Sequence, residues 1–415
     1  MNENLADLVS ERLPKPVLRL IQTAGLTASR SGLDLYLVGG IVRDLLLGRP
    51  SIDIDMTVEG DALELAATLA AKLHKKPVLH KRFGTATFKF GDYRIDLATC
   101  RSESYDRPGV LPEVKPGTIK QDLLRRDFTI NALAVCLEPS LFGNLIDHCD
   151  GRRDIKDKLV RILHSKSFQD DATRIMRAVR YEQRLGFKLE PVTLRTLDSD
   201  LCMLDTISGD RLRHEIVLWL GEDRPEKILK RASPLGILAR LNPALAWDPH
   251  WSRTFPAARK LHSGTRLTHL YFALLIYSLN SKQCDALLKR LGMAGGELCR
   301  TILDTIKLKQ RLELLDEPIL QPSEIYVKLS PFDRLAIRAN ALNCPSANVR
   351  RNLKLYLDKL VSIKPRLTGK DLMEMGVPEG RRVGFMLDRL LTARQDGEVR
   401  TRADELRLVR QLING

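Results

Sequence analysis

The sequence lacks the features of secreted and membrane-inserted proteins. Its seven cysteines form no Cys-x-x-Cys pair and no regular spacing, so a disulfide framework is not indicated. No apolar run approaches the roughly 20 residues that a membrane span requires. The first 20 residues contain acidic side chains and no apolar stretch of signal-peptide length. From these absences we expect a cytoplasmic protein with reduced, mostly buried thiols and no membrane association.

Internal repeats and low-complexity tracts are also missing, which leaves ordinary globular domains. A chain of 415 residues exceeds what one compact core usually holds, so two or three domains are expected. The net charge of +15 is uneven: residues 1–164 carry 24 basic and 22 acidic side chains, and residues 165–415 carry 43 and 30. This contrast indicates chemistry in the first part and a bound polyanion on the second, although a well-solvated basic surface explains it equally well.

The pattern of apolar residues changes near residue 165. Before it, segments with the strand period of two alternate with segments of helical spacing, and after it nearly every segment is helical. We therefore expect an α+β fold, with the strands in the first part and an all-α remainder. The expected strands of the first part cover residues 33–40, 52–58 and 84–99, the last being a pair, and the expected helices cover residues 41–48 and 61–75.

Two aspartates in the second of these strands form the first candidate site. Asp53 and Asp55 alternate with apolar residues, so both side chains point to the same face of the strand. Two neighbouring carboxylates repel each other unless a cation lies between them, and Mg²⁺ prefers carboxylates together with substrate phosphates. Asp96, on a later strand, supplies a candidate third carboxylate. Taken alone, an edge strand with solvated aspartates is the simpler explanation.

A glycine pair and an arginine lie just upstream of these aspartates. Gly39 and Gly40 end the first strand, where the missing side chains let backbone N–H groups approach an anion closely. A helix follows at once, and its N-terminal dipole favours phosphate, while Arg43 on the first turn adds a cationic donor. Together with the two aspartates, these residues predict a site for a triphosphate and a divalent metal ion.

At this point the chain resembles class II tRNA nucleotidyltransferases and bacterial poly(A) polymerases, within the polymerase-β-like superfamily. Five stretches match their motifs in order: LVGGIVRDLLLGRPSIDIDMT (37–57), DLLRRDFTINALA (122–134), DHCDGRRDIKDKLVRIL (147–163), FQDDATRIMRAVRYEQRLGF (168–187) and TISGDRLRHEI (206–216). The resemblance implies a nucleotidyltransferase head with a small mixed sheet at residues 1–165. It implies a helical neck at 166–245 and a helical body and tail at 246–415, which bind tRNA. With this resemblance, Asp53 and Asp55 are expected to hold Mg²⁺ and Asp96 to be the third catalytic carboxylate, and a structural role is the alternative for Asp96.

The fourth stretch contains the residues expected to select the nucleotide. Asp171 and Arg174 are three residues apart, so a helix places them on one face. A carboxylate accepts from an exocyclic amine and a guanidinium donates to ring nitrogen and carbonyl acceptors, which suits the edges of cytosine and adenine. The resemblance assigns base reading to this pair and places Arg177 and Arg180 near the phosphates or in support of the pocket. Without the other motifs, a solvated basic helix is the default interpretation.

This stretch also departs from the family. Relatives usually have Glu-Asp-Pro where this chain has Asp-Asp-Ala, ending at Ala172. Because proline fixes the backbone at the first turn of a helix, its loss affects the start of the helix more than base reading.

The arginine–arginine–aspartate stretch is expected to bind the sugar and phosphates of the nucleotide. The resemblance places Arg126 and Asp127 there, with Asp127 accepting a hydrogen bond from the ribose 2′-OH. A structural ion pair that holds the strand is the alternative for Arg125.

Three activities share such a head: complete CCA addition, partial addition of CC or A, and poly(A) addition. The loop at residues 102–123 is long, whereas CC-adding relatives have it shortened, and the segment after the aspartates favours tRNA enzymes over poly(A) polymerases. We therefore expect template-independent addition of C and A from CTP and ATP to the tRNA 3′ end. An A-adding specialist or a poly(A) polymerase is the alternative.

Two further possibilities concern lost or additional functions. A catalytically inactive RNA-binding protein is the alternative from another class, although the intact aspartates and Arg126 argue against it. Some relatives carry a His-Asp phosphohydrolase centre, but this chain has Tyr277-Ser278 where such a pair would fall. We therefore expect no hydrolase centre.

Overall fold

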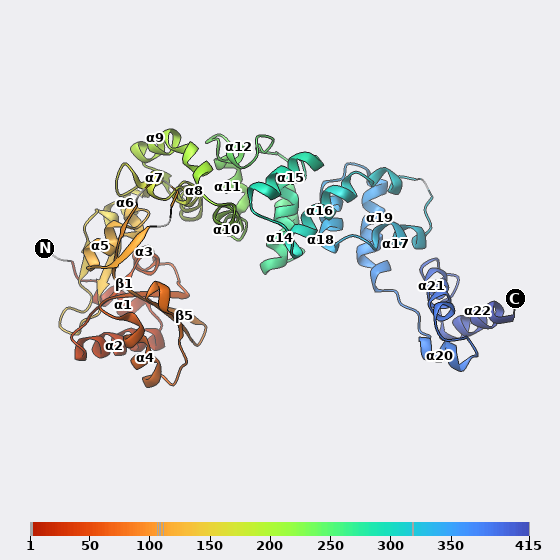
Figure 1. Cartoon of the computed structure of the whole chain (residues 1–415), viewed down its shortest axis with the longest axis horizontal. Coiled ribbons are helices and arrows are strands. Elements are labelled where there is room, and N and C mark those ends of the chain that lie inside the picture. The colour runs from red at the N-terminus through yellow and green to blue at the C-terminus, as the bar shows by residue number, and fades with distance from the viewer. Residues whose placement is uncertain (1–2, 106, 108, 111, 318, 415) are drawn as a thin grey trace. The chain divides into compact units, whose positions relative to one another are not determined.

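The computed structural model describes residues 3–105, 107, 109–110, 112–317 and 319–414. The chain forms two compact units, Met1–Ile207 and Ser208–Gly415 (Figure 1). All strands of the described residues lie in the first unit, as expected for an α+β chain with a helical remainder. The division into three domains at residues 165 and 245 stays a prediction. Among the described residues, no helix combines the length and apolar character needed to cross a bilayer.

A mixed seven-stranded sheet forms the centre of the first unit, as the sequence predicts. Only β2 and β5 run parallel to each other, and every other neighbouring pair is antiparallel. In spatial order the strands are β3 (Val78–His80), β4 (Thr85–Phe90), β5 (Tyr93–Thr99), β2 (Asp53–Glu59), β1 (Asp34–Val38), β8 (Leu133–Cys136) and β9 (Leu145–Asp147).

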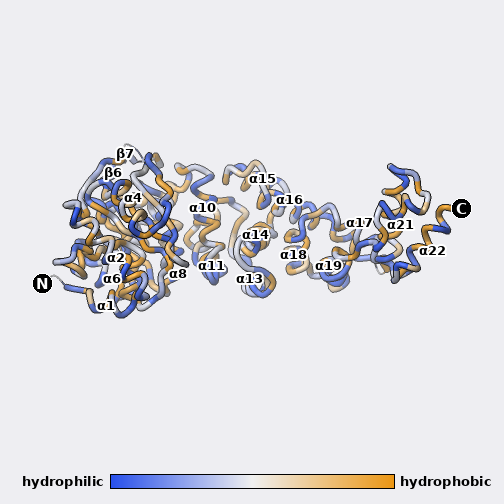
Figure 2. The backbone as a smooth tube through the Cα atoms, turned by 90° about the horizontal axis from the view of Figure 1, so that it is seen from below, coloured by the Kyte–Doolittle hydropathy of each residue, from blue (hydrophilic) through white to orange (hydrophobic). Residues whose placement is uncertain are grey.

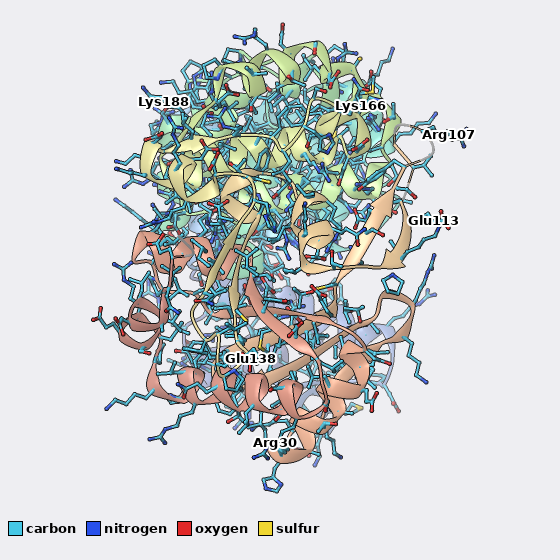
Figure 3. The ribbon with its side chains drawn as sticks, turned by 90° about the vertical axis from the view of Figure 1, so that its left-hand side faces the viewer. Arg30, Arg107, Glu113, Glu138, Lys166 and Lys188 are labelled. Atoms are coloured by element: carbon cyan, nitrogen blue, oxygen red, sulfur yellow. The ribbon has the colours of Figure 1, made fainter. Side chains whose placement is uncertain are left out.

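Helices pack around this sheet. They are α1 (Ala6–Arg12), α2 (Lys15–Arg30), α3 (Gly40–Leu47), α4 (Ala62–Lys72), α5 (Ile119–Leu124), α6 (Gly151–Asp157), α7 (Ser167–Asp170), α8 (Thr173–Leu185) and α9 (Pro191–Ser199). Helix α2 contacts β1, α4 contacts β4 and β5, and α3 contacts β1, β2 and β8. Figure 3 shows Arg30, the last residue of α2, at one end of this unit and Lys166 and Lys188 toward the other.

Strand β2 carries the residue pattern that positions the site. Ile54 and Met56 are buried in the core, whereas Asp53 and Asp55 point to the opposite face of the strand. Because side chains alternate along a strand, burying the apolar residues commits the two aspartates to the other face. The predicted same-face arrangement of the carboxylates is therefore a direct result of the core packing.

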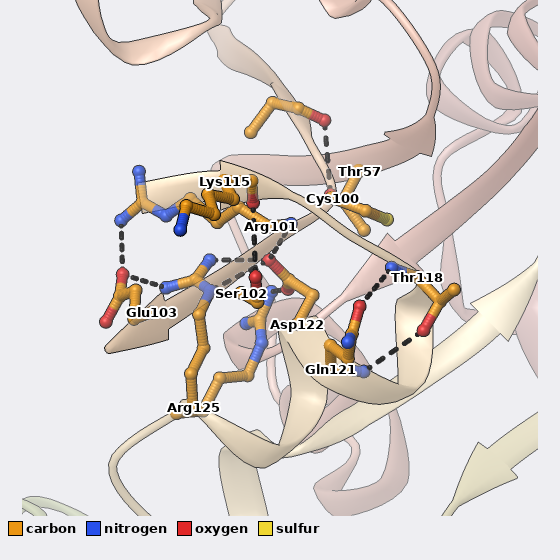
Figure 4. Close-up of polar contacts among 12 residues, drawn as sticks. Thr57, Cys100, Arg101, Ser102, Glu103, Lys115, Thr118, Gln121, Asp122 and Arg125 are labelled. Atoms are coloured by element: carbon orange, nitrogen blue, oxygen red, sulfur yellow. Dashed lines mark hydrogen bonds and ion pairs between the residues drawn. The ribbon is translucent and has the colours of Figure 1, made fainter. Parts of the chain in front are cut away.

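The segment expected to be a long loop contains regular structure. Strands β6 (Arg101–Ser104) and β7 (Glu113–Pro116) pair in an antiparallel hairpin, and α5 follows directly. The Thr118 side chain caps α5 by accepting from the Gln121 backbone N–H, and the Gln121 side chain accepts from the Thr118 N–H (Figure 4). The hairpin is thus fixed at its base by a capped helix.

Short parallel strands tie the end of the head sequence to the helices that follow. Strand β10 (Leu159–Val160) pairs with β11 (Lys188–Leu189), which comes directly after α8. The region from residue 166 onward, expected to be helical throughout, therefore includes one short strand.

The second unit is helical wherever it is described, in residues 208–317 and 319–414. Its helices are α10 (Gly209–Leu220), α11 (Pro225–Ala232), α12 (Ile237–Leu241), α13 (Trp251–Arg259), α14 (Gly264–Leu275), α15 (Ser281–Arg290), α16 (Glu297–Lys309), α17 (Pro322–Leu329), α18 (Arg334–Asn343), α19 (Ala347–Asp358), α20 (Gly369–Glu374), α21 (Arg381–Gln395) and α22 (Arg402–Asn414). Hydrophobic and hydrophilic residues alternate along these helices (Figure 2), as expected for helices with one buried face. One cluster of buried residues includes Leu329 and Leu353, and another includes Leu372 and Leu390.

Candidate nucleotide-binding site

An open polar cavity of about 460 Å³ lies in the first unit. Nine of the twelve predicted site residues line it, although they come from positions up to 137 residues apart in the sequence. They are Gly40, Arg43, Asp53, Asp55, Arg126, Asp127, Asp171, Arg174 and Arg177. The other three, Gly39, Asp96 and Arg180, are close in sequence or in strand register to lining residues but do not line the cavity themselves.

The glycine turn forms as the sequence predicts. Strand β1 ends at Val38, and Gly39 has a φ of 73°, which L side chains rarely adopt, before α3 begins at Gly40. A Cβ atom at Gly39 would lie only 2.5 Å from Nη1 of Arg126. The absence of a side chain at Gly39 therefore lets the Arg126 guanidinium pack against the turn.

The Arg43 side chain is buried and hydrogen-bonded to other protein groups, which its position in the sequence does not indicate. The side chain is 3% exposed, and its Nε and Nη2 donate to the Asp44 carboxylate at 3.0 Å. Its Nη1 donates to Oδ1 of Asn131 at 2.6 Å. Arg43 thus fastens α3 to the segment before β8, and its predicted phosphate contact stays a prediction.

The two β2 carboxylates form an electrostatically crowded pair. Asp53 and Asp55 both line the cavity, and Asp55 is paired in parallel register with Asp96 on β5. Burial raises the pKa of Asp55 to about 6, and the negative charge of Asp96 adds to this effect. A divalent cation at Asp53 and Asp55 would offset the repulsion, and carboxylate oxygens are ligands that Mg²⁺ takes. The residues therefore fit the predicted metal ion.

Asp96 is held by its own neighbours on the sheet. One carboxylate oxygen accepts from the Thr87 hydroxyl on β4, and the other lies 2.9 Å from Nε of Arg94. Since paired residues on adjacent strands share a face, Asp96 influences Asp55 through its charge. Its direct catalytic role stays a prediction.

A buried ion cluster at α5 organises the two arginines of the second motif (Figure 4). Asp122, which is 0% exposed, accepts from Nε and Nη2 of Arg125 at 3.0 and 2.6 Å and from Nη2 of Arg126 at 2.9 Å. Arg125 also donates to Glu103 on β6 at 3.0 Å. The structural ion pair considered for Arg125 is therefore present. Asp122 was not among the predicted residues, although its spacing of three and four from the arginines was a usable helical signal.

Asp127 is also buried, at 4% exposed, and has positive or polar groups beside both oxygens. Its Oδ1 accepts from Nδ2 of Asn131 at 3.0 Å and from the Phe128 N–H at 2.9 Å, and its Oδ2 lies 2.6 Å from Nη2 of Arg177. Burial alone would raise the pKa of Asp127, but the Arg177 charge and the Asn131 hydrogen bond hold it below the ordinary value. The carboxylate is therefore ionised and links the second motif to α8. Its contact with a ribose hydroxyl stays a prediction.

The predicted base-reading pair, Asp171 and Arg174, is arranged differently from the expectation. A single helix was expected to carry both residues, but α7 ends at Asp170, Asp171 has an extended backbone, and α8 begins at Thr173. The reason is local: the Asp171 carboxylate accepts from the Thr173 N–H at 2.9 Å, which caps the start of the new helix. Asp171 and Arg174 nevertheless line the same cavity.

Two further arginines of α8, Arg177 and Arg180, lie at or near the cavity on the helix side, and Arg184 of the same helix lines it. Arg177 pairs with Asp127, as described above. Arg180 is 9% exposed, and its guanidinium lies 5.4 Å from the ring centre of Tyr181, which also lines the cavity. This geometry favours a supporting role for Arg180 over a direct phosphate contact.

Two family models match the chain in sequence order. The Poly A polymerase head domain matches residues 35–161, and the model described as the probable RNA and SrmB-binding site of polymerase A matches residues 186–248. The first match covers the sheet and the cavity's strand and turn residues.

Individual proteins match over nearly the whole chain. An A-adding tRNA nucleotidyltransferase of Geobacter sulfurreducens is 37% identical over 98% of this chain and 48% of its own length. Another of that name, from Halalkalibacterium halodurans, is 30% identical over 100% of this chain and 96% of its own. A solved structure of a CCA-adding enzyme in complex with ATP superimposes with a TM-score of 0.78 at 30% identity, covering 99% of both chains. The chain thus spans about half the length of the first relative and nearly all of the other two.

Proposed function

Because this chain belongs to the tRNA nucleotidyltransferase family, we propose that it adds nucleotides from nucleoside triphosphates to the 3′ end of tRNA without a nucleic-acid template. The observation that carries this proposal is the cavity, which brings the β2 carboxylates together with Asp171 and Arg174. Transfer requires a centre that binds triphosphate and a centre that selects the base, and one cavity offers residues for both.

Two specificities fit this proposal. Complete CCA addition is the expectation from the sequence, and A-only addition is favoured by the names of the two relatives described above. Both include the transfer of A from ATP to a tRNA that ends in CC. They differ in whether CTP is used on a tRNA that lacks all three nucleotides.

Asp53 and Asp55 are the residues that would hold Mg²⁺. When bound, this ion lowers the pKa of an attacking hydroxyl and stabilises negative charge on the triphosphate. Arg126, whose guanidinium packs against Gly39, would supply positive charge to the phosphates beside the glycine turn. Asp171 and Arg174 offer an acceptor and donors to the edge of the base.

The decisive measurement is incorporation of labelled CTP and ATP into two tRNAs, one ending before CCA and one ending after CC. We expect one A to be added to the CC end, because this step is common to both specificities. Use of CTP on the shorter tRNA identifies CCA addition, and its absence identifies the A-adding specialist. Continued addition of A would indicate a poly(A) polymerase. Binding of tRNA without any incorporation would identify an inactive RNA-binding protein and contradict the proposal.

Replacing Asp171 tests base selection. In Asp171→Ala, the preference for ATP over GTP should fall by about ten- to a hundredfold, since a buried polar group left unpaired costs about 1–3 kcal/mol. Incorporation of each nucleotide into the CC-ending tRNA measures this ratio, and tRNA affinity serves as the control that should not change. An equal loss of rate with both nucleotides would make Asp171 a structural residue.

A further inference from the structure

The base-reading pair has its own buried support, which the motifs alone do not reveal. Arg174 is 4% exposed, and its Nη1 donates to the Ser167 hydroxyl at 2.8 Å and to the Ser167 carbonyl at 3.3 Å. Its Nη2 donates to the Arg125 carbonyl at 2.8 Å. Since the guanidinium is a rigid planar fork, anchoring two of its nitrogens fixes the directions of the remaining N–H groups. Ser167 itself is 0% exposed, so water does not readily replace its hydroxyl.

Asp171 has a matching hydroxyl partner. The Thr173 side chain, which is 6% exposed, donates to Oδ1 of Asp171 at 2.6 Å, and the Thr173 N–H reaches the same oxygen at 2.9 Å. Two donors from one residue hold this oxygen in place and so restrict the orientation of the carboxylate. The cap made by the backbone N–H survives a change of the Thr173 side chain, so the hydroxyl can be removed on its own.

We propose that Ser167 and Thr173 are positioning residues for nucleotide selection: Ser167 orients Arg174, and Thr173 orients Asp171. The inference rests on the proposed function, because it assumes that this pair contacts the base. Both hydroxyls contact the reading side chains, and neither Ser167 nor Thr173 lines the cavity. A base is discriminated by the direction of a few hydrogen bonds, and loss of a bond to a charged partner loosens that direction. The two hydroxyls therefore set how sharply one base is preferred.

The test compares side chains of nearly equal size. Thr173→Val removes the hydroxyl, Thr173→Ser keeps it, and Ser167→Ala removes the other. Thr193→Val is the matched control, because Thr193 is also buried in the first unit, makes hydroxyl bonds to Glu190 and to the Ile162 N–H, and lies outside the cavity. The measurements are the kcat/KM values for ATP and GTP on a tRNA ending in CC, and the Kd of each nucleotide without tRNA.

In Thr173→Val and Ser167→Ala we expect the ATP-over-GTP ratio to fall about tenfold in both measurements, as loss of a charge-assisted hydrogen bond implies. Thr173→Ser and Thr193→Val should retain the wild-type ratio. Equal losses with both nucleotides, or the same change in Thr193→Val, would overturn the proposal while leaving nucleotide transfer intact. If Ser167→Ala does not fold, the comparison of Thr173→Val with Thr173→Ser tests the proposal by itself. The two proposals can fail separately. If the wild-type protein transfers no nucleotide, but its Kd values prefer ATP and Thr173→Val loses that preference, the proposed function is contradicted and the positioning role is kept.

Discussion

Asp53→Asn and Asp55→Asn should each lower nucleotide incorporation by about a thousandfold or more, with tRNA affinity nearly unchanged. A preorganised electrostatic contact to the reacting groups is worth about 10²–10³ in rate, and these carboxylates would also hold the metal ion. Asparagine keeps the size of the side chain but removes its charge. Single-turnover incorporation of A into a CC-ending tRNA measures the loss, and filter binding measures the tRNA affinity.

Thermal unfolding without divalent ions separates a lost function from a lost fold. Because the β2 carboxylates repel each other and Asp96, removing one charge should leave the melting temperature equal or raise it. Asp92→Asn is the matched control, since Asp92 is an exposed aspartate in the turn between β4 and β5. It should behave like wild type in every measurement. More than a few per cent of activity in both β2 variants would contradict the assignment of a metal site there.

The second large effect concerns stability. Asp122→Ala should lower the stability of the first unit by about 3 kcal/mol, because it leaves Arg126 and Arg125, whose side chains are only 19% and 20% exposed, without this buried carboxylate. Hydrogen exchange of the β1, β2 and β8 amides reports on the stability of this unit directly. Tryptophan fluorescence does not, because the three tryptophans all lie beyond residue 208. Asp157→Ala is the control in the same unit, since its exposed ion pair with Arg153 should contribute less than about 0.5 kcal/mol. Unchanged protection in Asp122→Ala would show that the cluster does not hold the unit together.

The same carboxylate predicts a pH dependence. Burial alone would raise the pKa of Asp122, but the positive charges of Arg126 and Arg125 outweigh it and hold the pKa below the ordinary value. A group with a lowered folded-state pKa contributes stability that is fully present above its unfolded pKa of about 4. That contribution is lost as the pH falls through the folded-state value. The stability difference between wild type and Asp122→Asn should therefore be constant near neutral pH and shrink in acid.

Local sequence patterns predicted which residues lie at the site, but not the hydrogen-bond partners of those residues that are distant in sequence. The alternation of Ile54 and Met56 with the aspartates predicted β2 and its faces, and the glycines predicted the turn before α3. These features depend on neighbours in sequence, which is why they were accessible. Arg43 looked available for phosphate, but its partner Asn131 lies 88 positions away and no local pattern indicates it.

The start of α8 shows a different limit. The spacing of Asp171 and Arg174 fits a helix, yet a side-chain cap competes with helix continuation at aspartate and interrupts it there. Helical spacing gave two residues that line one cavity, but for a partly wrong reason. The hydroxyls of Ser167 and Thr173 were missed because serine and threonine occur at helix starts whether or not they support a site.

Two independent restrictions apply at Gly39, and together they limit which residues can stand at this position. Its backbone angle excludes most side chains, and the space that a Cβ would need is taken by the Arg126 guanidinium. Because its ψ is −125°, Gly39 lies outside the left-handed helical region that asparagine tolerates, so asparagine meets both restrictions. Moving Arg126 aside would relieve the crowding but leave the backbone strain and disturb the Asp122 cluster. A side chain at position 39 is therefore strained whichever residue stands at position 126.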